Sequence, residues 1–200
     1  MTLIIITSGI DLSVGSAMAM AAVAMGVSFR AGAPMPVAIL IALLTGLLGG
    51  LLNGFFISFV RVHPLLVTLA TYSAFRGFAE GISHGEPIKG FPAWFAHISG
   101  DITIGGGGVP IPGIIFILCA IFSAIILART PFGRSVYAMG FNETACRFSG
   151  SNTKRIKIIL YAVAGLAAGV AAVIYAWRVG TAAADQGEGF ELDVITAVVL

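Results

Sequence analysis

The chain has 200 residues, of which 58% are hydrophobic and only 10% charged, and its mean hydropathy is +1.01. A soluble domain carries roughly 25% charged residues, so this chain has too little polar surface to cover a globule in water. Its net charge of +2 gives no indication of a nucleic-acid partner.

Apolar segments long enough to cross a bilayer recur along the whole chain. A spanning helix needs about 20 predominantly apolar residues. Segment 64–80 is shorter and contains Arg76, so it could span or be re-entrant. Five apolar runs in a chain of this length argue against a large soluble protein whose interior helices would be equally apolar. The predicted spans are 1–28, 35–60, 64–80, 111–128 and 156–177, with the start of another at 192–200.

These spans predict an all-α fold, a polytopic transmembrane helix bundle that forms a single domain over residues 1–200. The first residues lack the basic region of a signal peptide. The last residues, TAVVL, lie within an apolar run. We therefore expect a fragment of a longer membrane protein, truncated at both ends.

The loops between the spans differ in charge. If the spans alternate across the membrane, one side receives Arg61 and the loop 129–157, with seven basic residues and one acid, Glu143. The loops on the other side carry three basic residues and four acids, and are 29–34, 81–110 and 178–190. Lysine and arginine are in excess on the cytoplasmic side of membrane proteins. The basic loop is therefore predicted to face the cytoplasm, provided that segment 64–80 crosses fully.

The stretch SGIDLSVGSA, residues 8–17, places an acid within the first span. An ionised Asp at the bilayer centre costs at least about 2.5–3.5 kcal/mol on insertion scales, so Asp11 needs a compensating role. Gly9 can break the helix. Asp11 or Ser13 can then cap the N-terminus of a new helix that runs through Met18 to Val27. Half-helices that point into a cavity recur at transporter midplanes, so Asp11 and Ser13 are candidate pathway residues; the alternative is that Asp11 only caps a helix.

A short internal repeat relates the two ends of the chain. IDLSVGSA at 10–17 aligns with FELDVITA at 190–197, with Leu, Val and Ala identical. Five predicted crossings separate the two copies, so their orientations would be opposite, as in the inverted repeats of many transporters. We therefore expect broken or re-entrant helices, an inverted repeat, and a pathway site formed by Asp11 with Glu191 and Asp193.

Two further polar residues within the spans are candidate pathway residues, namely Asn53 and Arg76. Asn53 interrupts an otherwise apolar span, and intramembrane ionisable groups such as Arg76 are functional candidates by default. Arg76 could instead extend to the membrane interface, or pair with Glu80 one turn later.

The basic loop contains a predicted short helix, from Asn142 to Phe148. Asparagine is a preferred N-cap residue, and Glu143 in the first turn suits the helix dipole. Gly140 and Gly150 are expected to mark the two ends. Such a helix, lying flat at the cytoplasmic face, suits docking onto another protein. The alternative is a basic surface loop that binds the anionic headgroups of membrane lipid.

Over four stretches, within residues 8–16, 132–150, 161–180 and 187–200, the chain resembles the permeases of ribose, xylose, arabinose and galactose ABC importers. These permeases belong to the superfamily of branched-chain amino acid and sugar permeases. The resemblance covers nearly all of the chain. It departs from the family pattern at Ser8, where a second glycine is usual, and at Cys146, where a small residue is usual. The matching stretches are SGIDLSVGS (8–16), FGRSVYAMGFNETACRFSG (132–150), YAVAGLAAGVAAVIYAWRVG (161–180) and GEGFELDVITAVVL (187–200).

The resemblance implies a multi-pass permease of the bacterial inner membrane that translocates a sugar, specifically a monosaccharide. Its implied partners are a second permease subunit, identical or paralogous, cytoplasmic ATP-binding subunits and a periplasmic sugar-binding protein. It implies no catalytic, cofactor or metal site, because ATP is hydrolysed on a partner subunit, and no Gly-rich loop followed by Lys-Ser/Thr occurs in the chain. Within the cytoplasmic loop 129–155, the implied ATPase-coupling residues are Gly140, Asn142, Glu143, Ala145, Arg147, Ser149 and Gly150.

Two other classes of function compete with this interpretation. An ion-coupled secondary transporter of a small polar solute would share broken helices and inverted repeats. Asp11 could serve its coupling ion, but the long cytoplasmic loop would then lack a purpose. A membrane-embedded enzyme is disfavoured, because the sequence shows no intramembrane His/Asp/Glu cluster and no Ser/His pairing.

Overall fold

The computed structural model describes residues 1–97, 101–104 and 107–200, and most of them are helical. The elements in chain order are α1 (Thr2–Ile6), α2 (Val14–Arg30), α3 (Met35–Phe55), the π-helix η1 (Phe56–Val60), α4 (Pro64–Ser83), α5 (Ala93–His97), β1 (Asp101–Ile104), β2 (Gly107–Pro110), α6 (Ile111–Arg129), α7 (Pro131–Phe141), α8 (Glu143–Phe148), α9 (Thr153–Val179) and α10 (Phe190–Val199).

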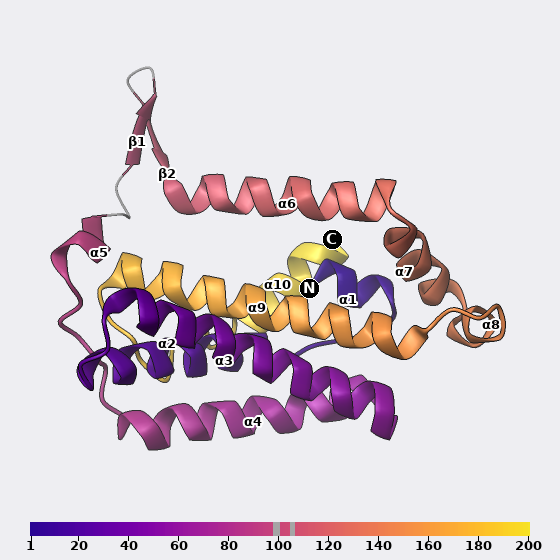
Figure 1. Ribbon diagram of the computed structural model, residues 1–200, viewed down its shortest axis with the longest axis horizontal. Helices are drawn as coiled ribbons and strands as arrows, with labels where there is room; N and C mark the ends of the chain where they lie inside the picture. Colours follow the sequence, from indigo (N-terminus) through magenta and orange to yellow (C-terminus); the bar gives the residue numbers. More distant parts are fainter. Residues whose placement is uncertain (98–100, 105–106) are drawn as a thin grey trace.

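The long helices run side by side along one direction (Figure 1). In the described part of the chain, three of them are long and apolar enough to span a membrane: α3 continued by η1, α6, and α9. α4 is less apolar, but its 20 residues extend about 30 Å, the thickness of the hydrocarbon core. The predicted all-α membrane bundle is confirmed. The antiparallel hairpin β1–β2 between α5 and α6 is an addition that the apolar pattern did not predict.

The connecting segments collect at the two ends of the bundle. α7 and α8 lie at one end, whereas α5 and the hairpin lie at the other (Figure 1). The basic loop 129–157 and the loop 81–110 are therefore at opposite ends, in agreement with the opposite sides expected from their charge. Below, the end that carries α7 and α8, which the charge pattern predicts to face the cytoplasm, is called the cytoplasmic end.

The most extensive helix pair is α3 with α9, and its contact face is built of small residues. A Cβ on Gly46 would meet the carbonyl oxygen of Gly165, and a Cβ on Gly50 would meet that of Tyr161. Small residues spaced by four let membrane helices approach this closely. The small residues of α3 on this seam recur every fourth position and are Ala38, Ala42, Gly46, Gly50 and Gly54.

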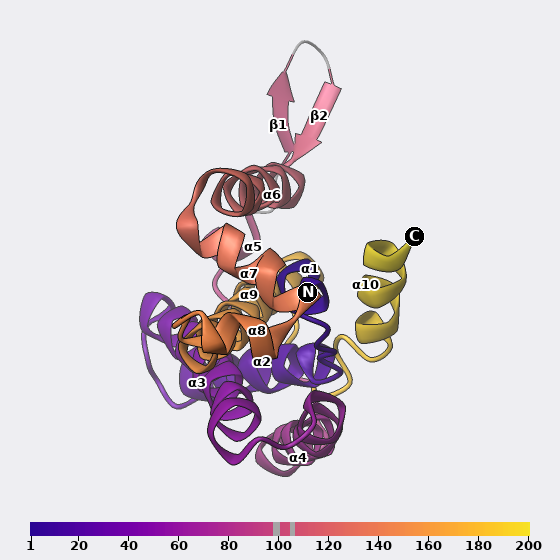
Figure 2. The same cartoon turned by 90° about the vertical axis from the view of Figure 1, so that its right-hand side faces the viewer.

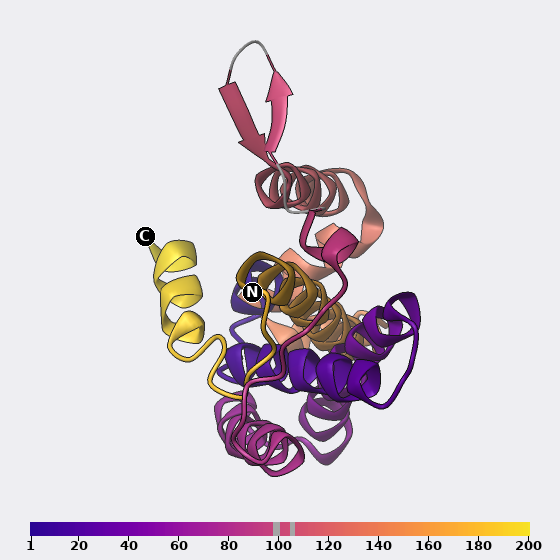
Figure 3. The ribbon, with the colours of Figure 1, turned by 90° about the vertical axis from the view of Figure 1, so that its left-hand side faces the viewer.

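Helix α6 lies to one side of α2, α3, α4 and α9 (Figure 2, Figure 3). None of its residues is buried, and side chains such as Phe116 are largely exposed. A helix that is apolar on all sides and uncovered suits a membrane environment or contact with neighbouring helices. α6 thus offers an apolar surface that the rest of the described chain does not cover.

Candidate functional site

The first predicted span is broken in its interior. α1 ends at Ile6 and α2 begins at Val14, with Ser13 as its N-cap residue. The predicted break is therefore confirmed, and the new helix begins directly after Ser13 and runs through the expected 18–27. The residue with left-handed backbone conformation between the two helices is Ser8, with φ 59°, rather than Gly9. Glycine adopts this left-handed conformation without steric cost, which explains the second glycine in the pattern of the resembled permeases.

Asp11, Ser13 and Asn53 form one buried hydrogen-bonded group at this break. Asp11 Oδ1 accepts hydrogen bonds from the backbone N–H of Ser13 (2.9 Å) and from its hydroxyl (2.7 Å). Asn53 Nδ2 donates to Ser13 Oγ (2.8 Å). All three residues are at most 2% exposed, and Asn53 Oδ1 has no partner in the described structure. The group therefore joins the start of α2 to α3 and leaves one buried acceptor for a water or solute.

The hydroxyl of Ser13 does not cap α2, contrary to one of the two capping alternatives, since it is used by Asp11 and Asn53. Asp11 caps the turn that precedes the helix, because it accepts from the N–H two residues further on. The geometry is thus compatible with the purely structural role for Asp11, and its burial beside Asn53 is compatible with the pathway role.

These two roles predict different behaviour for two substitutions of Asp11. In the structural role, Asp11→Asn keeps an oxygen that accepts from Ser13, so the melting temperature of the detergent-purified protein should fall only slightly. Asp11→Ala leaves buried donors unpaired and should cost about 1–3 kcal/mol of stability. If Asp11→Asn instead abolished solute uptake at an unchanged melting temperature, the carboxylate charge itself would be required for transport.

The start of α10 packs against the start of α2. A Cβ on Gly15 would meet the carbonyl oxygen of Gly187 and Oε2 of Glu191. Glu191 is 8% exposed; its Oε1 accepts from Gly189 N–H (3.3 Å), and its Oε2 has no hydrogen-bond partner in the described structure. The two copies of the internal repeat therefore meet at Gly15 and Glu191. Asp193 is exposed and does not join this contact.

Arg76 does not pair with Glu80, which was one of the alternatives to a pathway role, and Glu80 is exposed in the described structure. The Arg76 guanidinium instead donates to the carbonyl oxygens of Ala184 and Gln186. These carbonyls belong to the segment 180–189, which connects α9 to α10 and passes beside α2 and α4 (Figure 3). Arg76 therefore holds this connecting segment against α4 and is separate from the Asp11 group.

At the cytoplasmic end, the short helix predicted from Asn142 to Phe148 is present as α8. The side-chain oxygen of Asn142 accepts from the N–H of Ala145 (2.9 Å), which is the expected N-cap. Glu143 pairs with Lys157 Nζ of α9 (2.7 Å). Gly150 follows the helix with φ 88° and allows the chain to turn.

Gly140 does not end this element, contrary to expectation, because it lies inside α7, a helix that the sequence interpretation missed. A Cβ on Gly140 would meet the carbonyl oxygen of Ile6 at the end of α1. The available signal was the pair Thr130–Pro131: Thr130 Oγ1 accepts from Gly133 N–H (3.2 Å), and proline occupies the first helical position. Gly140 is thus a packing position between α7 and α1.

The outer surface around α8 carries two exposed aromatic rings. Phe141, the last residue of α7, is 91% exposed, and Phe148, the last residue of α8, is 87% exposed. Exposed large apolar side chains at a polar end of a protein indicate an interaction surface. The expected coupling residues Ala145, Arg147 and Ser149 of this segment are also exposed, and Arg147 lines a pocket between α8 and α9.

In residues 1–97, 101–104 and 107–200, no group of three or more His, Cys, Asp and Glu side chains is placed to hold a metal ion. The broken-helix site offers hydrogen-bonding oxygen and nitrogen atoms and two buried carboxyl groups. Such groups can orient a polar solute, whereas the α8 surface offers contact area to a partner.

Comparison with known proteins extends over the full length of the chain. Residues 1–200 match the family model described as the branched-chain amino acid transport system permease component. The autoinducer 2 import system permease protein LsrD of Yersinia enterocolitica is 38% identical over all of this chain. The protein of the same name from Escherichia coli K12 is 39% identical over all of it.

The chain spans 61% and 62% of the lengths of these two relatives, respectively. No solved structure matches the chain.

Proposed function

Because the chain belongs to the family of branched-chain amino acid transport system permease components, we propose that it forms the membrane-spanning pathway of an ATP-binding-cassette importer. It is a multi-pass protein of the bacterial inner membrane, in keeping with its apolar helices. Transport, rather than an enzymatic reaction, is the function of this chain, and ATP hydrolysis occurs on a separate subunit.

The observation that carries this proposal is α8 with its surroundings. A capped helix of six residues, which follows the exposed ring of Phe141 and ends with the exposed ring of Phe148, projects from the cytoplasmic end. A helix this short is not stable by itself, so its cap and its ion pair with α9 maintain its conformation. It therefore presents a preformed contact surface where an ATP-binding subunit would dock.

The packing provides a route from this surface to the broken helix. Glu143 of α8 forms an ion pair with Lys157 of α9, and α9 packs against α3 through the small residues of their contact face. Asn53 of α3 is bonded to Ser13 at the start of α2. Closure of the ATP-binding subunits would displace α8, and these contacts would carry the displacement to the break as rigid-body motion.

A second contact chain reaches the same break from its other side. α7 touches the end of α1 at Gly140, where the backbones approach closely. α1 contacts both α7 and α9, whereas α2 packs against α3, α4 and α9. A displacement of α8 that moved α7 relative to α9 would therefore change the separation of α1 and α2, which is one way to alternate access at a midplane site.

For the substrate we propose a small polar solute of the sugar type. The uncharged groups of Ser13 and Asn53 suit hydroxyl groups, which both donate and accept hydrogen bonds. The two relatives are named for the import of autoinducer 2, and a monosaccharide is the second candidate. Competition of each compound against radiolabelled substrate uptake in cells that express the natural gene product separates the two candidates.

The remaining proposed partners follow from the same assembly. A second copy or a paralogue of this permease would complete the pathway, and α6 offers uncovered apolar surface for such a helix contact or for lipid. A periplasmic solute-binding protein would dock at the opposite end, where α5 and the β1–β2 hairpin lie (Figure 1).

Docking of the ATP-binding subunit is tested by purification of the natural gene product in mild detergent. We expect the subunit to co-purify. The double substitution Phe141→Ala/Phe148→Ala should lower its recovery at least about tenfold, because each buried phenylalanine contributes about 1.5–3 kcal/mol to a contact. Glu143→Gln should retain the subunit but weaken the dependence of ATP hydrolysis on solute, because the ion pair with Lys157 of α9 is lost.

Phe116→Ala on α6 is the matched control, because this ring is 73% exposed but lies away from α8. It should leave the recovery of the ATP-binding subunit unchanged. A well-folded wild-type protein that transports solute without an ATP-binding subunit would overturn the importer proposal. It would favour the ion-coupled secondary transporter, with Asp11 as the coupling carboxylate.

A further inference from the structure

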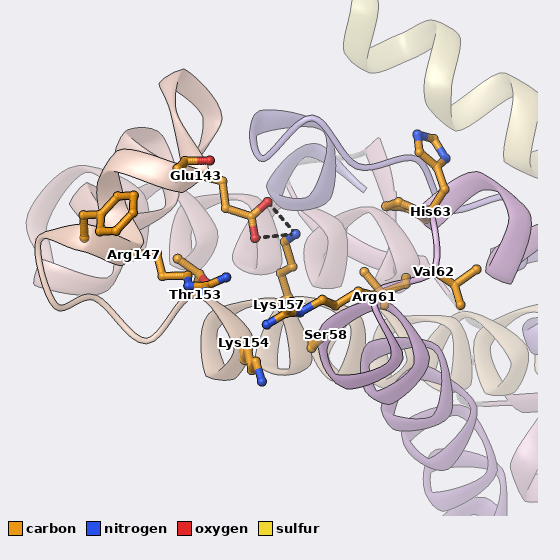
Figure 4. Close-up of a pocket in the computed structure, with 13 residues that line it drawn as sticks. Ser58, Arg61, Val62, His63, Glu143, Arg147, Thr153, Lys154 and Lys157 are labelled. Atoms are coloured by element: carbon orange, nitrogen blue, oxygen red, sulfur yellow. Dashed lines mark hydrogen bonds and ion pairs between the residues drawn. The ribbon is translucent and has the colours of Figure 1, made fainter.

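A pocket of about 470 Å³ lies at the cytoplasmic end, between the end of η1, α8 and the first turns of α9 (Figure 4). It is separate from the broken-helix site. Its charged lining is mostly basic, and its single acidic member, Glu143, is paired with Lys157. The residues that matter for its chemistry are Ser58, Arg61, Arg147, Thr153, Lys154 and Lys157.

Two arginines of the pocket have no carboxylate partner in the described part of the chain. The salt bridge found there joins Glu143 to Lys157, so Arg61 and Arg147 are not neutralised. Their guanidinium groups come from different elements and point toward the same space beside Lys157 (Figure 4). Lys154, with its Nζ 5.2 Å from the centre of the Phe59 ring, adds a further positive charge at the edge. The pocket therefore has a net positive charge and suits an anion.

A buried hydroxyl provides an independent indication of a ligand. Ser58 is 4% exposed and lines the pocket, yet its Oγ has no hydrogen-bond partner in the described structure. A buried polar group without a partner costs stability, and η1 is a π-helix, a conformation that is frequent at functional sites. The pocket thus combines an unused donor with unpaired arginines, and the N-terminus of α9 adds its dipole.

The surroundings of the pocket indicate the source of the anion. Next to it, η1 and the start of α4 expose apolar side chains, including Phe59 (53%) and Leu66 (62%). In a membrane these side chains contact acyl chains, and basic pockets between helices on the cytoplasmic side bind phospholipid headgroups. We propose that this pocket binds the phosphate group of an anionic phospholipid from the cytoplasmic leaflet. The bound phosphate bridges Arg61 at the end of η1 and Arg147 of α8.

The test is native mass spectrometry of the natural gene product with phosphatidylglycerol or with zwitterionic phosphatidylcholine. We expect phosphatidylglycerol to bind preferentially. Arg61→Gln should weaken this binding about fivefold, since a basic residue near the surface is worth about 1 kcal/mol. Ser58→Ala should weaken it about tenfold through loss of a hydrogen bond to a charged group. Ser58→Ala removes one buried hydroxyl that has no protein partner, so it should fold normally.

Arg155→Gln is the matched control, because Arg155 is exposed in the same turn of α9 but does not line the pocket. It should leave phosphatidylglycerol binding unchanged. An equal loss with Arg155→Gln would show general attraction to a basic surface and overturn the proposal.

Two further outcomes would also overturn the lipid assignment. Binding of inorganic phosphate to the delipidated protein, sensitive to Ser58→Ala and competitive with phosphatidylglycerol, would assign the pocket to free phosphate. If the Ser58 and Arg61 variants retained phosphatidylglycerol but lost the ATP-binding subunit, the pocket would receive an acidic side chain of that partner.

Discussion

Gly46→Ala is expected to destabilise the protein by about 3 kcal/mol or more, although it adds a single methyl group. The new Cβ would overlap the carbonyl oxygen and nearby backbone atoms of the facing helix α9. Overpacking costs about 1–3 kcal/mol where side chains can move aside. Here the neighbours are backbone atoms, so the whole helix must move. Thermal unfolding of the detergent-purified natural gene product measures the effect.

Gly77→Ala on α4 is the matched control for this substitution. A Cβ there has nothing within 4 Å, and alanine is favoured over glycine in a helix by about 0.5–1 kcal/mol. The same chemical change should therefore raise the melting temperature at position 77 and lower it at position 46. Equal shifts at the two positions would contradict the close packing of α3 against α9.

Gly165→Ala tests the same contact from the other helix, because its Cβ would meet the carbonyl oxygen of Gly46. Once one methyl group has separated α3 from α9, a second should cost less. The double substitution Gly46→Ala/Gly165→Ala is thus expected to be less destabilising than the sum of the two single changes.

The spans and the cytoplasmic helix could be predicted because their signals are local. Long apolar runs predicted α3, α6 and α9, since a helix must satisfy its own backbone groups within a membrane. α8 was predicted from Asn142 and Glu143, because an N-cap and a first-turn acid act within one turn. The break before α2 was likewise indicated by an acid that could not remain unpaired in an apolar helix.

The parts that could not be predicted depend on contacts between distant segments. Gly140 was taken as a helix terminator, yet its role is set by the approach of Ile6. Nothing near Asn53 in sequence indicates that it bonds to Ser13, forty positions away. Local spacing offered Glu80 as one possible partner of Arg76, but the guanidinium donates to the backbone carbonyls of a segment more than a hundred residues away.

Arg76→Ala is expected to release the segment 180–189 from α4 and to impair transport strongly. The guanidinium donates to the carbonyl oxygens of Ala184 and Gln186, and hydrogen bonds from a charged donor contribute about 1.5–3 kcal/mol each. A loss of roughly 2–3 kcal/mol in local opening free energy would speed amide hydrogen exchange in this segment about 30- to 150-fold. Exchange measured by mass spectrometry, together with solute uptake, checks both expectations.

Two variants separate this positioning role from a direct contact with solute. Arg76→Lys keeps the charge, but its shorter side chain does not place the ammonium where Nη1 donates to both carbonyl groups. Exchange should therefore rise partway and uptake should fall in proportion. Glu80→Gln should change neither, because Glu80 is exposed and unpaired in the described structure. Segment 180–189 leads into α10, whose Glu191 contacts the start of α2 at Gly15. If uptake failed in Arg76→Ala while exchange in the segment stayed at the wild-type rate, Arg76 would act on the solute itself rather than through the position of α10.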